Sequence, residues 1–123
     1  NSPYDFMVRP YNVLTTEAPE IFAACKRLGW ENYACTPFIR GWQLDKMLAV
    51  APAIEKFGRD RDKLRADLAD AMLRYSLFQP HVNRLIVAMR DVRWVAPNAN
   101  SARQGPNTQR QWHWLDRLTA MLP

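Results

Sequence analysis

Apolar and polar positions along the chain predict strands and helices in alternation. Residues 4–12, YDFMVRPYN, begin as a strand, and Pro10 ends its hydrogen-bond ladder because proline lacks an N–H. Residues 14–30, LTTEAPEIFAACKRLGW, then predict a helix capped by Thr16 and stopped at Gly29. Four positions at helical spacing form its inward face: Ile21, Phe22, Cys25 and Leu28.

The middle of the chain repeats this order. Residues 31–38, ENYACTPF, predict a short strand closed by Thr36 and Pro37. Residues 41–58 predict one or two short helices, with a break at Pro52. Residues 59–80, RDRDKLRADLADAMLRYSLFQP, give the clearest helical pattern. Its apolar side chains share one face: Leu64, Leu68, Ala71, Met72 and Tyr75.

The last third begins with RLIVAM, residues 84–89, which predicts an apolar strand covered on both faces. A short helix follows with Asp91 as its cap and breaks at Pro97. Residues 98–109 read as a loop, and residues 109–122 as a closing helix. That helix buries Leu115, Leu118 and Leu122.

Strands that alternate with helices predict an α/β domain with a parallel sheet and right-handed crossovers. Only three strands are visible, so both edges would be unpaired and one face would lack cover. We therefore expect residues 1–123 to form one domain that is part of a larger unit.

Composition narrows the function classes. The chain is 48% apolar and 24% charged, which is typical of a globular protein. Its formal charge is +5, but residues 60–67 mix both signs, as solvated helix faces do, and no basic stripe interleaves with aromatic residues. We therefore expect no nucleic-acid partner. The longest apolar run, 47–54, is broken by proline and is too short for a membrane span, so no membrane partner is expected either.

The two cysteines give little evidence of a metal site. Cys25 and Cys35 lie ten residues apart, without a CxxC pair or a nearby histidine. Cys25 falls on the apolar face of a predicted helix, where a buried and unreactive thiol is expected. This pattern fits a cytoplasmic protein without a metal ligand set.

Four blocks of the sequence, in order, resemble the C-terminal portion of an aldo-keto reductase. They are PYN, GW…YACTPFIRG, ADLADAMLRYSLFQPHVNRLIV and WHWLDRL, and together they cover almost the whole chain. The resemblance implies a partial (β/α)8 TIM barrel, with the three strands as its strands 6 to 8, their helices and a C-terminal helix. It also implies an NAD(P)-linked oxidoreductase.

In such a barrel the functional groups lie at the carboxyl ends of the strands. A phosphate binds well to backbone N–H groups at a helix start together with arginine, and Arg90 and Arg93 follow LIVAM in this way. The alternative is an ordinary surface turn. The resemblance implies that ten residues bind NADP or NAD: Tyr11, Asn12, Thr36, Phe38, Arg40, Lys46, Ala88, Arg90, Arg93 and Asn98.

The chain departs from the family pattern at several of its cofactor positions. Val8 stands where the family commonly has Gln, Cys35 where it has an aromatic ring, and Ala88 where it has a glycine. Trp94 replaces an Arg or Gln, and Pro97 replaces a Glu and is expected to disrupt its helix. The family's catalytic residues belong to its N-terminal half, so no catalytic residue is assigned in this chain.

Three functions follow as alternatives. The chain is the NAD(P)-binding side of a reductase whose catalytic half lies elsewhere, a degenerate non-catalytic homologue used for binding or assembly, or an unrelated basic interaction module. For the first two we expect the partner to be the N-terminal half of the same barrel or another completing chain. That partner would cover the strands that carry Val8 and Ile86, and the chain alone would bind NADPH weakly or not at all.

Overall fold

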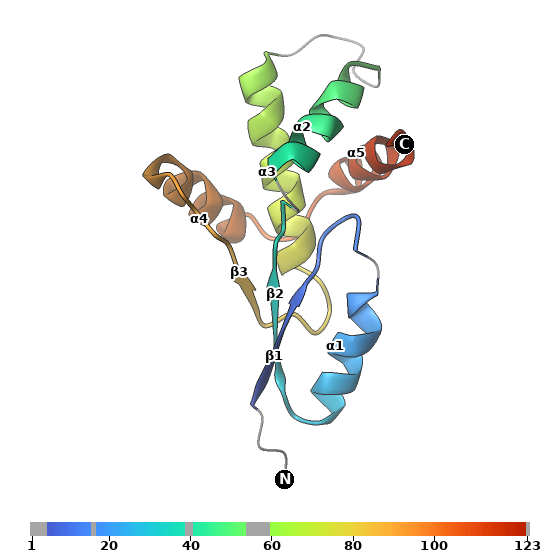
Figure 1. The fold of residues 1–123 in the computed structure, drawn as a ribbon, viewed down its shortest axis with the longest axis vertical. Coiled ribbons are helices and arrows are strands. Elements are labelled where there is room, and N and C mark those ends of the chain that lie inside the picture. Colours follow the sequence, from blue (N-terminus) through green and yellow to red (C-terminus); the bar gives the residue numbers. More distant parts are fainter. Residues whose placement is uncertain (1–4, 16, 39–40, 54–59, 123) are drawn as a thin grey trace.

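The computed structural model describes residues 5–15, 17–38, 41–53 and 60–122 of the chain (Figure 1). These residues form three strands, five α-helices and two 3-10 helices. In chain order they are β1 Phe6–Pro10, α1 Ala18–Arg27, β2 Glu31–Cys35, α2 Gly41–Val50, η1 Ala51–Ala53, α3 Arg61–Leu77, β3 Arg84–Ile86, η2 Val92–Trp94, α4 Val95–Arg103 and α5 Gln109–Ala120.

The three strands form one parallel sheet in the order β1-β2-β3. Val8 lies opposite Tyr33, and Tyr33 opposite Arg84, so these three side chains form a row on one face. Both outer strands are sheet edges within the described part of the chain. The parallel sheet and its three strands confirm the prediction from the alternating pattern.

One face of the sheet is covered and the other is open. Asn32 and Ala34 of β2 are fully buried beneath α1 and α3, where Ala34 packs with Phe22. On the opposite face, Phe6 and Val8 of β1 are 53% and 44% exposed, and Ile86 of β3 is 46% exposed. The expectation that one face would lack cover is confirmed, whereas the prediction that RLIVAM is covered on both faces is wrong.

A second core lies beyond the carboxyl ends of the strands, where α2, α3 and α5 pack on one another (Figure 1). Its fully buried side chains include Leu68 and Met72 of α3 and Leu118 of α5, at the spacing predicted from the sequence. Tyr75 of α3 packs against this core and also against the cluster beneath the sheet. Helix α3 therefore joins the two cores.

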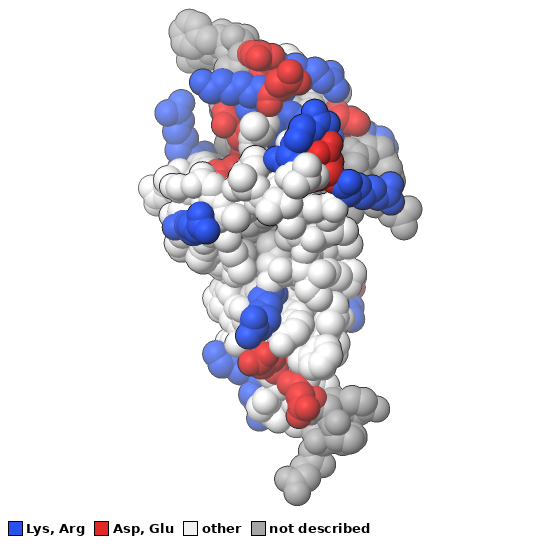
Figure 2. Space-filling model, turned by 90° about the vertical axis from the view of Figure 1, so that its left-hand side faces the viewer, with Lys and Arg blue, Asp and Glu red and all other residues white. Residues whose placement is uncertain are grey.

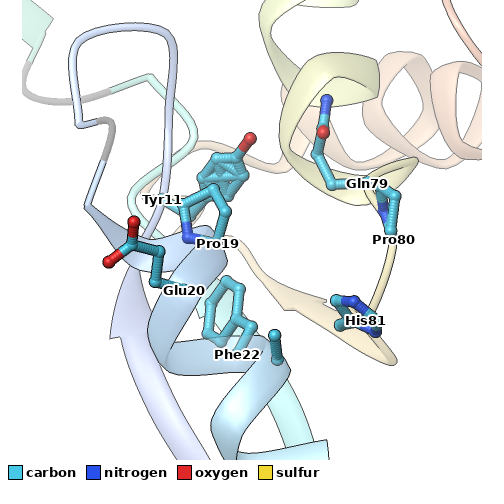
Figure 3. A pocket seen from close by; sticks show the side chains of 8 residues that line it. Tyr11, Pro19, Glu20, Phe22, Gln79, Pro80 and His81 are labelled. Carbon is cyan, nitrogen blue, oxygen red and sulfur yellow. The ribbon is translucent and has the colours of Figure 1, made fainter.

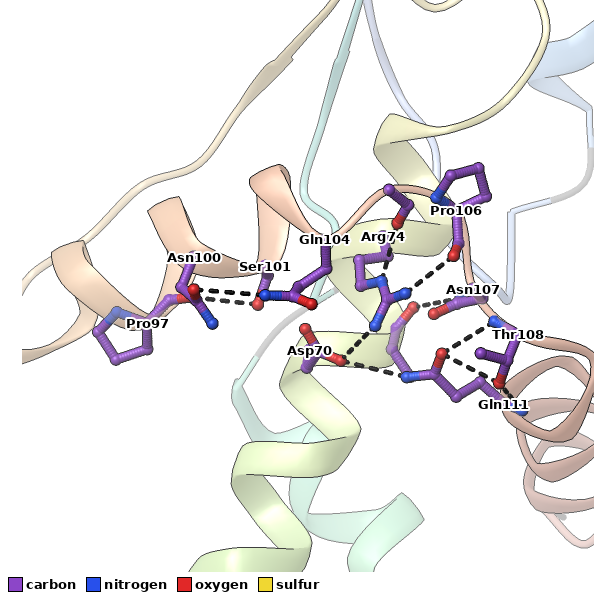
Figure 4. A network of polar contacts seen from close by, with 12 residues as sticks. Asp70, Arg74, Pro97, Asn100, Ser101, Gln104, Pro106, Asn107, Thr108 and Gln111 are labelled. Carbon is purple, nitrogen blue, oxygen red and sulfur yellow. Dashed lines mark hydrogen bonds and ion pairs between the residues drawn. The ribbon is translucent and has the colours of Figure 1, made fainter.

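The segment between α4 and α5 is held to α3 by a polar network (Figure 4). Arg74, 9% exposed, donates to the carbonyl oxygens of Gly105 and Pro106 at 2.9 and 2.8 Å and pairs with Asp70 at 3.0 Å. Asn107 donates to the Ala71 carbonyl at 2.8 Å. Because the buried side chains of Arg74 and Asn107 tie backbone carbonyl groups of α3 and of the segment before α5, they fix where α5 begins.

The prediction of a partial (β/α)8 TIM barrel with strands 6 to 8 is wrong. The described residues form a small α/β structure with an open three-stranded sheet and five α-helices. The strands are short, and β3 has only three residues, so they offer little apolar surface for helices to cover. Helices α2, α3 and α5 instead bury their apolar side chains against each other.

Two local predictions also need correction. Residues 98–109 are not a loop throughout, because α4 extends from Val95 to Arg103. Pro97 does not break this helix. It lies in the first turn of α4, where a missing N–H costs nothing because that donor has no intrahelical acceptor. The predicted cap Thr16 lies outside the described residues, and α1 begins after Glu17 without a side-chain cap.

Candidate functional site

The first two predicted cofactor residues follow β1, and both are buried. Asn12, 2% exposed, donates from Nδ2 to the Thr36 carbonyl at 3.1 Å and accepts at Oδ1 from Leu14 N–H and the Thr15 hydroxyl, both at 3.0 Å. This side chain joins the ends of β1 and β2. Because its polar atoms are already bonded within the chain, Asn12 shapes the carboxyl edge instead of presenting free groups there.

Tyr11 belongs to the core beneath the sheet. It is 3% exposed and makes edge contacts with the rings of Phe22 and Tyr75 at 5.9 and 5.6 Å. Burial, followed by its hydrogen bond to Tyr75, raises the pKa of the Tyr11 phenol well above its usual value. The Tyr11 ring contributes packing beneath the sheet.

The residues after β2 lie at the same edge but are not gathered around one point. Thr36 is exposed and has a φ of +53°, and its hydroxyl donates to the Cys35 carbonyl at 2.8 Å. Phe38 packs half-buried against the helical core. Lys46 is exposed on α2, and Arg40 lies outside the described residues.

In the turn after β3, the carboxylate of Asp91 already accepts hydrogen bonds from the donors of Arg93. Asp91 caps η2 by accepting from Arg93 N–H at 2.9 Å, and its other oxygen accepts from Arg93 Nε at 2.8 Å. These bonds from Arg93 lower the pKa of the Asp91 carboxyl and raise the pKa of Arg93. A phosphate approaching this helix start would therefore meet a negative charge already bound to the donors.

The remaining predicted cofactor residues do not form a pocket together with the turn after β3. Ala88 and Arg90 are exposed between β3 and η2, and Asn98 is half-buried within α4. The structure thus brings Asn12 and Thr36 into direct contact. It does not assemble Ala88, Arg90, Arg93 and Asn98 into a phosphate site in the described part of the chain.

A shallow pocket of about 390 Å³ lies between α1 and the segment that links α3 to β3 (Figure 3). Tyr11, Phe22 and Pro19 form apolar walls, and Gln79 and His81 lie on the far side. Figure 3 shows the Glu20 carboxylate pointing away from these residues. Because polar groups do not converge on one point here, the pocket has no arrangement suited to chemistry.

The open face of the sheet carries an ordered row of aromatic and charged side chains. Phe6 stacks on Tyr33 with ring centroids 5.1 Å apart and an interplanar angle of 15°, and the Arg84 guanidinium lies 5.9 Å from the Tyr33 ring centre. Glu31 accepts from the Tyr33 hydroxyl at 2.8 Å, which raises the pKa of that phenol. These contacts fix the side-chain conformations of Phe6, Tyr33 and Arg84 on a surface that no described element covers.

Phe6, Tyr33 and Arg84 were not predicted from the sequence as functional residues. The sequence held part of the information needed, since the strands that carry Val8 and Ile86 were expected to need cover. Phe6, Tyr33 and Arg84 stand at alternating positions along the same paired strands. What was missing was the strand register, which places the five side chains on the same face. Together, Phe6, Val8, Tyr33, Arg84 and Ile86 are called the open face below.

Among the described residues, no group of His, Cys, Asp or Glu side chains is arranged to hold a metal ion. Within the same part of the chain, every helix is too short or too polar to cross a membrane. Comparisons with protein families, with curated proteins and with solved structures found no match for this chain. The resemblance to aldo-keto reductases therefore stays a prediction.

Proposed function

We propose that this chain is a binding or assembly module whose open face is covered by a partner polypeptide. The observation that carries the proposal is the exposure of Phe6, Val8 and Ile86 on one face of a parallel sheet. Parallel sheets are normally covered on both faces, and contiguous exposed apolar surface is typical of protein-interaction sites. The stacking of Phe6 on Tyr33 supports this, because a preset surface loses less side-chain entropy on binding.

The test is a double substitution on the open face, Phe6→Lys with Val8→Lys. If the face serves a partner, both changes should leave the chain folded and lower its free energy of unfolding by about 1–2 kcal/mol, since the Phe6–Tyr33 stacking is lost and both side chains are about half exposed. They should also reduce the fluorescence increase of the apolar dye ANS. Leu28→Lys with Met121→Lys, at exposed apolar positions that follow α1 and α5, is a matched control that should keep the ANS signal.

Partner binding itself is measured with the purified chain as bait. A protein that co-purifies at one-to-one stoichiometry, rebinds as a purified component and is lost with the double substitution would support the proposal. A wild-type chain that stays monomeric, unfolds cooperatively and gives no ANS response would contradict it. So would loss of folding in the double variant, since the face would then belong to the chain's own core.

A second proposal is that the chain supplies the NAD(P)-binding side of an aldo-keto reductase-like oxidoreductase, with catalytic groups from another polypeptide. One observation favours it: Asn12 and Thr36 meet at the carboxyl edge of the sheet, where open α/β sheets bind ligands. NADPH should then bind only after the partner is added, with turnover of a carbonyl substrate. A purified complex that binds no NADPH would contradict this proposal.

A cytoplasmic location is proposed with either function. Its support comes from the chemistry of the two cysteines. Cys25 and Cys35 are both free thiols, and Cys25 is buried, which is the usual state of cysteine in reducing compartments.

A further inference from the structure

The unpaired edge of β3 continues into a strip of exposed apolar side chains. β3 pairs with β2 alone among the described strands, so its outer edge has unpaired backbone groups. Beyond it, exposure is 42% for Met89, 83% for Val92 and 43% for Trp94. The β3-edge surface is defined by Arg84, Ile86, Met89, Arg90, Val92 and Trp94.

β3 is short and begins with the charged Arg84, which are two of the features that protect natural edge strands from pairing. The rest of the strand lacks two other such features, since it has no further charge and no proline. Here Leu85 and Ile86 are apolar, and the described helices leave Ile86 46% exposed. Figure 2, which views the molecule from the side of β3 and α4, shows a broad area with few charges between charged groups at both ends.

The charges nearest this surface are positive. Arg84 begins β3, where it contacts the Tyr33 ring, and Arg90 is exposed just beyond the strand. Neither makes an ion pair with an acidic side chain of the described residues, whereas Asp91 is bound to Arg93 at 2.6 Å. A complementary partner would therefore place acidic side chains at both ends of an apolar segment.

We propose that the partner docks by adding an extended strand to the β3-edge surface, with apolar side chains along Ile86 and acidic side chains near Arg84 and Arg90. This inference rests on the proposed assembly function and names the chemistry of the partner segment that binds at β3, two strands away from Phe6 and Val8. Strand addition satisfies the unpaired backbone groups of β3, which a helix laid on the open face would leave unpaired. A second copy is disfavoured because each chain carries +5 and would bring like-charged arginines together.

The experiment uses two synthetic peptides, DVTVTVE and KVTVTVK, and the full chain. Amide hydrogen exchange of residues 84–86 is measured with each peptide, together with binding by fluorescence anisotropy. We expect DVTVTVE to slow exchange at these amides and to bind at least about fivefold more tightly than KVTVTVK. The variant carrying Arg84→Glu and Arg90→Glu should reverse this preference. Both positions are exposed, and Arg103→Glu with Arg117→Glu is the matched control that should keep it.

Each result is decisive for the inference. Protection confined to β3 that follows the charge reversal supports strand addition. Absence of protection at β3 with both peptides overturns it, and so does protection of β3 that depends on chain concentration without peptide, which would identify a second copy as the occupant. Because the ANS and rebinding tests probe Phe6 and Val8 independently, the proposed function can survive failure at the β3 edge.

Discussion

Thr36 has a backbone conformation that β-branched residues rarely adopt. Its φ of +53° lies in the left-handed region, and its side chain is exposed. The conformation persists because Asn12 Nδ2 donates to the Thr36 carbonyl and so fixes the peptide at the end of β2. The strain therefore belongs to the junction of two strands.

Thr36→Gly should stabilise the chain by about 1 kcal/mol, because glycine adopts positive φ without the penalty of a branched side chain. The hydroxyl that is lost donates only to the adjacent Cys35 carbonyl and is solvent-exposed. Urea denaturation of both proteins measures the change. Thr36→Ala is the control, since alanine also has a Cβ and should recover less of the gain. A less stable glycine variant would show that the threonine side chain has a packing role.

The Asp91–Arg93 contact predicts a pH-dependent turn. Arg93 lowers the pKa of the Asp91 carboxyl, so the cap of η2 is complete above the ordinary aspartate pKa and is lost as pH falls through the lowered value. Arg93→Gln should raise the Asp91 pKa toward its ordinary value. Carboxyl chemical shifts in an NMR titration follow this change, and Arg110→Gln is the control. Identical Asp91 titration in wild type and Arg93→Gln would refute the pairing.

At the scale of elements, α3 organises the molecule. Its apolar residues join the core with α2 and α5, while Ser76 donates to the Tyr11 carbonyl at 2.8 Å beneath the sheet. On another side, Arg74 binds two carbonyls of the segment before α5. One helix thus sets the position of the sheet, the helical core and the C-terminal helix.

Arg74→Met should destabilise the fold by about 2–4 kcal/mol. The substitution keeps side-chain volume but leaves the Gly105 and Pro106 carbonyls and the Asp70 carboxylate without their buried donor. Thermal and urea unfolding measure the loss. Arg117→Met on exposed α5 surface is the control and should change stability by less than about 0.5 kcal/mol. An equal effect of both substitutions would mean that the network contributes nothing specific.

At the scale of the whole molecule, the predicted cofactor residues are spread over separate parts of the structure. Asn12 and Thr36 meet at the sheet edge, Tyr11 is in the core, and Arg93 is bound to Asp91. The open face, in contrast, is continuous and preset. This distribution agrees better with assembly than with cofactor binding by the chain alone.

The chain by itself should bind NADPH with a dissociation constant weaker than about 1 mM, which corresponds to about 4 kcal/mol of binding free energy. The reason is that the Asp91 carboxylate occupies the N–H groups that would hold a phosphate. Nicotinamide fluorescence during titration measures the affinity. Asp91→Asn removes the negative charge and should strengthen whatever binding is present. Saturation of the wild type at micromolar NADPH would contradict the prediction.

Predictions from the sequence were correct where the deciding interactions join residues close together in the chain, and less accurate where they join distant segments. Helix α3 and the buried Leu115 and Leu118 of α5 were predicted correctly because helical periodicity is local. The start of the helical segment after Asp91 was predicted, but residues 98–103 of α4 were predicted as a loop because Asn and Ser suggest one and Pro97 was expected to break the helix. Ser101 is buried and donates to the Pro97 carbonyl at 3.1 Å. Helix α3 packs against α4, and this contact between distant segments is not visible in the local sequence pattern.

The candidate site was predicted less well. The sequence correctly placed Asn12 and Thr36 at strand ends, where parallel strands bring them to one edge. Asp91 was expected to cap the helix after β3, but the sequence did not predict that its carboxylate would bind the donors of Arg93. It also missed Phe6, Tyr33 and Arg84 as one surface, because strand register depends on contacts between segments far apart in the chain.

The sequence by itself determined the α/β class, the three parallel strands, the main helices and the need to cover one sheet face. These features, of which the last means only that one face lacks cover within the described residues, follow from hydrophobic periodicity and from the chain direction that strand-helix alternation imposes. Only the tertiary structure decided that α2, α3 and α5 pack on each other beyond the sheet, and that the sheet stays open instead of forming part of a barrel. Which apolar surfaces meet depends on the packing of distant segments, and a one-dimensional pattern of apolar positions does not specify that pairing.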